Sequence, residues 1–382
     1  MAIFFRRAVV LAALLFCALP VLAAEAAFAG FAYAGDLQSA TARFPYSRAL
    51  DAHQAGGLNA EVRNAVANVK PDHFSLIPRI GDLNGRDQAV AVAMVLTSET
   101  ASTERYGAAY KLLVQLRAQV MFFDFKSKTV LRAYPISFAY IDVLGAPPTP
   151  AQIGDRVAAV YRGIGGKAGL IQRFADTLQH ATIPTNVPRF VQVTSVAVGD
   201  EARAQFPEYL RGPAGDTWIA DAFGEALSAR LGMPILPYAK GYAIGAVMAL
   251  TVDDSTVFNL TLPKPDYEFS VDIAKLRKVL YSEQAAGKSW IYGALANVQL
   301  VEPLSDTAYL RSGFKNGEVK VVPASQATTD DFPAFEDAMR GLFAKLSRAV
   351  AGEESPWLAS SADAKDIAQQ ITKTRELLKS CK

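Results

Sequence analysis

Two glycine-containing segments come closest to known nucleotide-binding motifs. Residues 282–289, Ser-Glu-Gln-Ala-Ala-Gly-Lys-Ser, resemble a P-loop whose first glycine is replaced by Ser282, and residues 163–168, Gly-Ile-Gly-Gly-Lys-Ala, resemble a dinucleotide-binding fingerprint. A P-loop must lead from a strand into a helix, and the fingerprint must follow a strand. The first segment is followed by a strand-like run and the second follows a helical pattern. We therefore interpret both as turns and expect no nucleotide cofactor.

Histidine, serine and cysteine form no local catalytic or metal-binding pattern. His53, His73 and His180 are too far apart in the sequence to share a helix face, and no His-Glu-x-x-His or Gly-x-Ser-x-Gly segment occurs. Cys381 lies beside the C-terminus, where ordered catalysis is not expected. We interpret it as a free thiol, with an intermolecular disulfide as the alternative. The sequence thus predicts no catalytic residue, no metal site and no cofactor.

Carboxylates support the best enzymatic alternative. Asp253–Asp254, Asp330–Asp331 and Glu353–Glu354 are adjacent pairs, and Asp36 and Asp200 occupy matching places in two similar segments. Neighbouring residues on a strand face opposite ways, so adjacency alone does not make an acid–base pair. We interpret Asp330 as a helix cap, and Asp36 and Asp200 as turn residues. The alternative function is a periplasmic hydrolase that uses Asp and Glu residues in the cleft between two halves of the chain. The sequence favours a non-catalytic protein over this alternative.

The composition limits the class of protein. The chain has 382 residues, 39 Lys+Arg against 37 Asp+Glu, two Cys and 51% hydrophobic residues. This length suits two domains, and the apolar fraction excludes a disordered chain. A near-neutral charge argues against nucleic-acid binding, which needs a concentrated cationic surface. Two cysteines cannot form a disulfide-rich scaffold or a cysteine-based zinc site.

The N-terminus has the pattern of a secretory signal peptide. Arg6 and Arg7 precede an apolar run over residues 8–19, which is too short to span a bilayer, and small residues precede a cleavage site after Ala23. Cys17 lies within the apolar run and lacks the small residues of a lipid-attachment site. No second long apolar run follows. We expect a periplasmic or secreted protein whose mature chain has no transmembrane span.

The remaining chain reads as two similar halves. The segment ending in Asp36 resembles the one ending in Asp200, and a Phe-Pro pair follows each at a similar distance. Each half then shows an amphipathic helix, an apolar strand and a hairpin of alternating polarity. The matched apolar strands are 89–96 and 243–252. The matched hairpins are 112–122 with 130–140 around the turn 124–128, and 267–273 with 289–301 around the turn 286–288.

These patterns predict an α+β (α/β-like) fold of two tandem related domains. Each domain has a mixed sheet with a long β-hairpin and flanking helices, and a C-terminal helix completes the chain. We predict the boundaries as 1–23 for the signal peptide, 24–183 for the first domain, 184–352 for the second and 353–382 for the C-terminal loop and helix.

Aromatic residues crowd the first hairpin on both faces of its strands. If only one face of that sheet is covered, the other would expose apolar area and mark a surface for a partner or ligand. The alternative is a sheet buried on both faces by helices and by the second half. The residues concerned are Phe122, Phe123, Phe125, Tyr134, Phe138 and Tyr140.

The turn of this hairpin, Phe123-Asp-Phe-Lys-Ser-Lys-Thr-Val-Leu131, resembles a motif of secreted bacterial α/β domains. They are the curli-secretion-channel family, the N-terminal domain of the Tol-system propeller protein and the outer-membrane activators of peptidoglycan synthases. The resemblance covers about 120 residues of each half, and it implies non-enzymatic roles in envelope assembly through protein–protein contacts. The second half departs from it, because residues 282–290 lack the Asp and the turn pattern.

The sequence therefore predicts an exported, non-catalytic envelope protein with a role in cell-envelope assembly or transport. Its expected partner is an envelope protein or a small apolar ligand.

Overall fold

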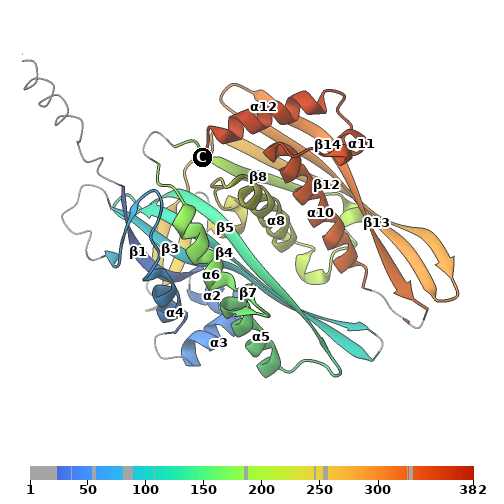
Figure 1. Ribbon diagram of the computed structural model, residues 1–382, viewed down its shortest axis with the longest axis horizontal. Coiled ribbons are helices and arrows are strands. Elements are labelled where there is room, and N and C mark those ends of the chain that lie inside the picture. Colours follow the sequence, from blue (N-terminus) through green and yellow to red (C-terminus); the bar gives the residue numbers. More distant parts are fainter. Residues whose placement is uncertain are drawn as a thin grey trace, which may run out of the picture.

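The computed structural model describes residues 24–35, 37–53, 57–80, 89–106, 108–184, 188–244, 247–252, 257–324, 326 and 330–382. It combines helices and mixed sheets, so the fold is α+β as predicted (Figure 1). The predicted signal peptide, residues 1–23, lies outside the described residues.

The first sheet contains eight strands in the order β2-β1-β3-β4-β5-β11-β10-β9, and β1 also pairs with β10. β1 is parallel to β2 and β3, whereas β3, β4 and β5 form antiparallel hairpins. Strands β9 to β11 come from the second half of the chain and join this sheet. The strands are β1 (Glu25–Ala34), β2 (Ser75–Ile77), β3 (Val90–Tyr106), β4 (Ala109–Asp124), β5 (Thr129–Leu144), β9 (Ala243–Ile244), β10 (Val247–Val252) and β11 (Val257–Thr261).

Helices cover one face of the first sheet and enclose its core with Phe122 and Phe174. A capping box of Thr149 and Gln152 starts α5, because each side chain bonds to the other's backbone amide. Residues 163–168 form the short β6–β7 pair between α5 and α6, so the turn interpretation is confirmed. The elements are α2 (Leu37–Arg43), α3 (Pro45–His53), α4 (Gly57–Val66), α5 (Pro150–Arg162), β6 (Gly163–Ile164), β7 (Lys167–Ala168) and α6 (Leu170–His180).

The second sheet has four strands in the order β14-β13-β12-β8, with α8 and α10 on one face. Helix α8 lies between the two sheets (Figure 1). Residues 282–289 form the turn between β12 and β13, so they are no P-loop. The elements are β8 (Val191–Val198), α7 (Asp200–Arg203), the 3-10 helix Glu208–Leu210, α8 (Pro213–Leu231), α9 (Ala239–Tyr242), β12 (Tyr267–Gln284), β13 (Gly287–Glu302), β14 (Thr307–Pro323), α10 (Phe332–Ala351), α11 (Pro356–Ser361) and α12 (Ile367–Lys379).

Strands β1-β3-β4-β5 and β8-β12-β13-β14 share one topology, a parallel pair followed by two antiparallel hairpins. Their irregularities also correspond. The β3–β4 register shifts after Leu96 and the β12–β13 register after Ile273, 177 positions later. The β4–β5 register shifts after Phe122 and the β13–β14 register after Leu300, 178 positions later.

This correspondence corrects the hairpin alignment made from the sequence. The β4–β5 hairpin matches β13–β14, whereas the sequence comparison had matched it with β12–β13. The matching turn is therefore Glu302–Asp306, where Asp306 has φ 52° and Lys128 of the first turn has φ 55°. Similarly, β3 corresponds to β12 and not to residues 243–252.

Candidate functional site

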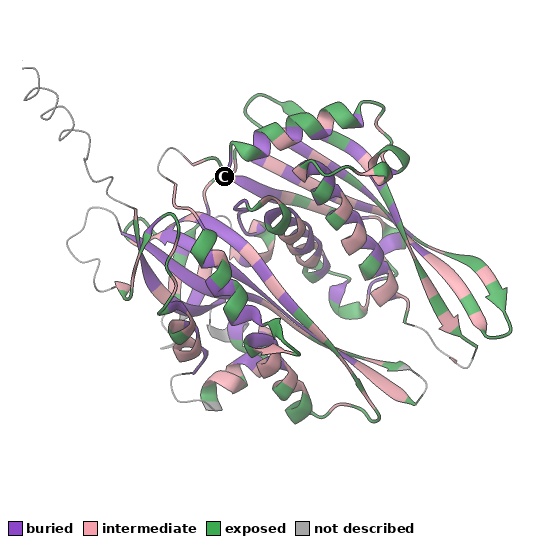
Figure 2. Cartoon of the chain, in the orientation of Figure 1, coloured by how far each residue is buried: buried purple, intermediate pink, exposed green. Residues whose placement is uncertain are grey.

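Each sheet ends in a three-stranded extension beyond its first register shift. We call residues 98–106, 109–117 and 137–144 arm 1, and residues 275–284, 287–295 and 315–323 arm 2. Figure 1 shows both arms extending past the helices toward the same side of the view, and Figure 2 shows that burial decreases along them. A bulge at the base of a strand bends it and increases its twist, which carries each arm away from the body.

The outermost strand of each arm exposes two β-branched apolar side chains. Ile141 and Val143 are 54% and 68% exposed, and Val319 and Val321, each 178 positions later, are 56% and 70% exposed. Cross-strand pairing puts the half-buried Leu113 beside Ile141 and Ile291 beside Val319. In arm 1 these side chains lie on the face turned away from α5, and in arm 2 on the face turned away from α10, because their strand neighbours pack toward those helices. Clustered exposed apolar side chains of this kind mark a contact surface.

The same strands keep a free backbone edge at their tips. Along β14, Arg311 and Gly313 donate their amides to Gln370 Oε1 and Asp363 Oδ1, so the edge near the body is capped by the C-terminal segment. The backbone N–H and C=O groups of every second residue of β14 point to this edge. Those of Val319 and Val321 have no hydrogen-bond partner there among the described residues. In β5, Ile235 N donates to Ala133 O near the body. No described strand pairs with the edge beyond, although the amide of Val143 donates to Asp142 Oδ1 at 2.9 Å.

The two arm tips differ in polarity. Arm 2 adds Val279 and Tyr281, 54% and 68% exposed, to its apolar surface. In arm 1, Ser102 corresponds to Val279, whereas Tyr281 is the extra residue at a register shift between Leu280 and Ser282. Glu104, which corresponds to Ser282, forms an ion pair with Lys111 at 3.4 Å. Arm 2 is therefore the more apolar of the two surfaces.

The aromatic residues of the first hairpin do not form a surface, which corrects that prediction. Phe122, Tyr134 and Phe138 are buried beneath the helices, and Phe123 is buried on the other face against the segment around β10 and β11. Phe125 and Tyr140 are half-buried. The alternative interpretation, a sheet covered on both faces, holds. The cause is that residues from the second half of the chain, in and next to β10 and β11, pack against that face.

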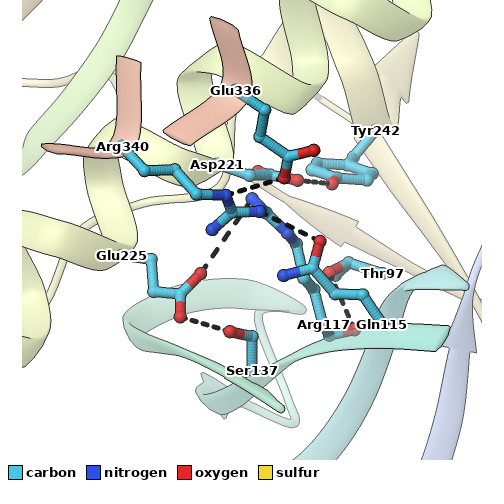
Figure 3. A network of polar contacts seen from close by, with 9 residues as sticks. All are labelled: Thr97, Gln115, Arg117, Ser137, Asp221, Glu225, Tyr242, Glu336 and Arg340. Atoms are coloured by element: carbon cyan, nitrogen blue, oxygen red, sulfur yellow. Dashed lines mark hydrogen bonds and ion pairs between the residues drawn. The ribbon is translucent and has the colours of Figure 1, made fainter. Parts of the chain in front are cut away.

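The polar side chains that alternate along β4 lie on the face opposite the helices that cover Phe122. Gln115, Arg117 and Gln119 are buried, because their face packs toward α8 and α10. Arg340 donates to Gln115 Oε1 at 3.0 Å and pairs with Glu336 at 2.8 Å (Figure 3).

Two further carboxylates occupy this network. Glu225 accepts a hydrogen bond from the Ser137 hydroxyl and lies 4.0 Å from Arg117 Nη1, and Asp221 accepts one from the Tyr242 hydroxyl (Figure 3). Burial raises the pKa of Asp221 to about 6, and the nearby Arg117 opposes this effect. Burial also raises the pKa of Tyr242, so its hydroxyl stays protonated and can donate to Asp221. The network brings carboxylates into the region between the halves, but each already has a donor partner.

The other sequence candidates lie apart from one another. Asp330 Oδ1 accepts from the amide of Phe332, the first residue of α10, although the N-cap residue itself is Asp331. His180 Nδ1 lies 2.7 Å from Asp72 Oδ2 on the surface, His73 is exposed, and Asp200 starts α7. Asp36, Asp253, Asp254 and the His53 side chain lie outside the described residues.

Cys381 is a buried free thiol packed with α12, and burial raises its pKa to about 11. Among the described residues, no three His, Cys, Asp or Glu side chains come together as a metal site. None of the described helices has both the length and the apolar character needed to cross a membrane.

No family model and no curated protein matches this chain. Solved structures with some similarity include a neuraminyllactose-binding hemagglutinin homologue from Helicobacter pylori, with 13% identity and a TM-score of 0.27 over 52% of this chain and 92% of that chain. A Xanthomonas campestris protein of the DUF330 family has 13% identity and a TM-score of 0.23 over 44% and 86%. A minor lipoprotein from Acinetobacter baumannii has 8% identity and a TM-score of 0.21 over 42% and 90%. TM-scores this low carry no functional argument.

Proposed function

We propose that this chain is an exported, non-catalytic envelope protein that binds a protein partner through the tips of its two β-arms. The observation that carries the proposal is the recurrence of two exposed β-branched residues on a strand edge that no described strand covers, Ile141 and Val143 in arm 1 and Val319 and Val321 in arm 2. We further propose that residues 24–183 and 184–352 arose as related units, which the shared strand order and register shifts support. We also propose a role in cell-envelope assembly or transport, because the hairpin turn resembles that of envelope-assembly domains.

The partner that fits this surface is an extended protein segment with alternating apolar side chains. A free strand edge supplies backbone hydrogen bonds to an added strand, and alternate side chains supply specificity. Val319 and Val321 offer both features at once, because their side chains are exposed and their backbone groups point outward. A small apolar ligand, the other sequence prediction, would need an enclosed cavity rather than this open face.

Photo-cross-linking tests the proposal. p-Benzoylphenylalanine replaces Tyr281 at the tip of arm 2 or, as a control, the similarly exposed Tyr209, which lies outside both arms in the 3-10 helix before α8. We expect one protein to cross-link at position 281 and not at position 209. Cross-links to lipid would identify a membrane surface instead, and cross-links between copies of the chain would identify self-association. Either result, or equal products at both positions, contradicts the proposal.

A matched pair of variants tests strand addition itself. Val319→Ala and Val319→Pro both remove the exposed side chain, but only proline removes the outward backbone donor. We expect Val319→Ala to reduce cross-linking a few-fold and Val319→Pro to reduce it at least tenfold, with circular dichroism unchanged. Equal effects of the two variants would show that the partner contacts the side chain of Val319 without pairing with the backbone of β14.

A carboxylate-based hydrolase is the second candidate, because Asp221 lines a pocket and has a pKa of about 6. A group that titrates near neutrality suits general acid–base chemistry. Assays with ester, glycoside and phosphate-ester substrates test this function. We expect no turnover, whereas turnover abolished by Asp221→Asn would favour the hydrolase over the binding protein.

A further inference from the structure

A pocket between the first sheet and α8 contains an arginine whose terminal nitrogens have no hydrogen-bond partner in the described part of the chain. The pocket has a volume of about 470 Å³, which lies within the range of small-molecule sites. Arg117 lines it with a side chain only 5% exposed, and neither Nη1 nor Nη2 has a hydrogen-bond partner among the described residues. A buried guanidinium without hydrogen bonds is costly, so its donors call for a bound acceptor.

The carboxylates closest to Arg117 do not meet that need. Glu225 lies 4.0 Å from Nη1, beyond hydrogen-bond distance, and accepts a bond from Ser137. Asp221 accepts a bond from Tyr242 (Figure 3). Across the pocket, Glu99 accepts bonds from the backbone and hydroxyl of Ser47. These acceptors are therefore committed to other donors.

Two more cations face the same space. Arg43 donates to the carbonyl oxygens of Ala34 and Thr97, and no described carboxylate lies within ion-pair distance of it. Lys240 is exposed at the rim of the pocket. The ring of Trp218 lies 5.9 Å from the Arg117 guanidinium and supplies an apolar wall.

We propose that this pocket binds a small organic anion whose carboxylate or phosphate group pairs with Arg117 and whose apolar body packs against Trp218. The planar guanidinium matches the geometry of such an oxyanion, and Arg43 and Lys240 add attraction. The site lies away from the arm tips, so its failure would leave the proposed partner binding untouched.

Binding of three ring compounds to the full mature chain tests the site. Benzoate carries a carboxylate, phenyl phosphate a phosphate, and benzyl alcohol the same ring without charge. Isothermal titration at constant ionic strength should show millimolar or tighter binding of at least one anion. No binding of benzyl alcohol is expected. Comparison of the two anions shows which oxyanion the pocket accepts. Binding of benzyl alcohol with equal affinity, or of none of the three, overturns the proposal.

Variants assign the binding to Arg117. Arg117→Met should weaken the bound anion at least tenfold, whereas Arg348→Met, an exposed arginine on α10, should leave its affinity unchanged. Equal losses in both variants contradict the assignment. If Arg117→Met does not fold, Lys240→Met at the exposed rim decides the question. A few-fold loss of affinity supports the site, and an unchanged affinity overturns it.

Discussion

The two sheets share a strand order but differ in what covers them. In the first sheet, helices bury one face around Phe122, and α8 with the segment around β10 and β11 buries the other face around Phe123. In the second sheet, α8 and α10 bury one face, and the opposite face carries exposed residues such as Asn297. Gln119, the counterpart of Asn297 in the first sheet 178 positions earlier, is buried.

This difference shows that alternating polar residues along a strand do not reveal whether that face of the sheet is buried or exposed to solvent. Gln119 and Asn297 have similar side chains at corresponding positions, yet one faces a protein interface and the other faces solvent. In the buried row, Nη1 and Nη2 of Arg117 have no hydrogen-bond partner among the described residues, which creates the candidate anion site. The open row leaves the tip of arm 2 accessible, which creates the candidate partner surface.

The largest expected effect concerns the covered faces. Phe122→Ala and Leu300→Ala, at corresponding buried positions, should each lower the free energy of unfolding by about 3–5 kcal/mol. On the other face, Phe123→Ala should cost about 3 kcal/mol, but Val301→Ala, half-buried in the second sheet, only about 1 kcal/mol or less. Urea denaturation followed by circular dichroism measures these values. Similar costs at Phe123 and Val301 would mean that both sheets are covered alike.

The next effect tests the interface that covers the first sheet. Because the pKa of Asp221 rises to about 6 on folding, folding favours its protonated form, and this contribution to stability is lost as pH rises from about 4 to 6. Arg117, Arg43, Glu225 and Tyr242 are the titratable or charged groups that influence it. At 1.36 kcal/mol per pKa unit, the upper limit is about 3 kcal/mol.

Asp221→Asn checks this pH dependence. The free energy of unfolding of the wild type, minus that of the variant, should decrease between pH 4 and pH 6. A difference that stays constant across this range would show that the carboxyl is not buried by the α8 interface.

A smaller effect separates the two arms. Val319→Asp with Val321→Asp should reduce cross-linking from position 281 at least tenfold, about 1.4 kcal/mol, because charge replaces the apolar contact. Ile141→Asp with Val143→Asp should reduce it about threefold, because arm 1 already carries the Glu104–Lys111 pair. The reverse order would assign the main contact to arm 1.

The smallest effect compares the two corresponding turns. Lys128 and Asp306 both have positive φ, a conformation that costs a side-chain residue about 1 kcal/mol and that Asp tolerates better than Lys. Lys128→Gly should therefore raise the thermal midpoint more than Asp306→Gly does. Opposite changes in the midpoint would show that the turns are not equivalent in energy.

Much of the local structure could be predicted from the sequence. Alternating polarity placed the hairpins β4–β5 and β12–β13, and the residues after the P-loop-like segment correctly indicated a strand. The alignment of the two halves was predicted less well, because it matched the turn after Asp124 with the turn within residues 282–290. The better signal was Glu302 with Ser305 and Asp306, whose spacing matches Asp124, Ser127 and Lys128.

Sequence alone therefore determined the α+β class and the positions of many strands and helices, because these follow from local periodicity and turn chemistry. It did not predict β11 or β14. Tertiary structure decided which faces are covered. The residues in and next to β10 and β11 bury Phe123, and the position of α8 buries Arg117. Such contacts join segments far apart in the chain, so no local pattern records them. Both candidate sites arise from this unequal coverage of two sheets with the same strand order.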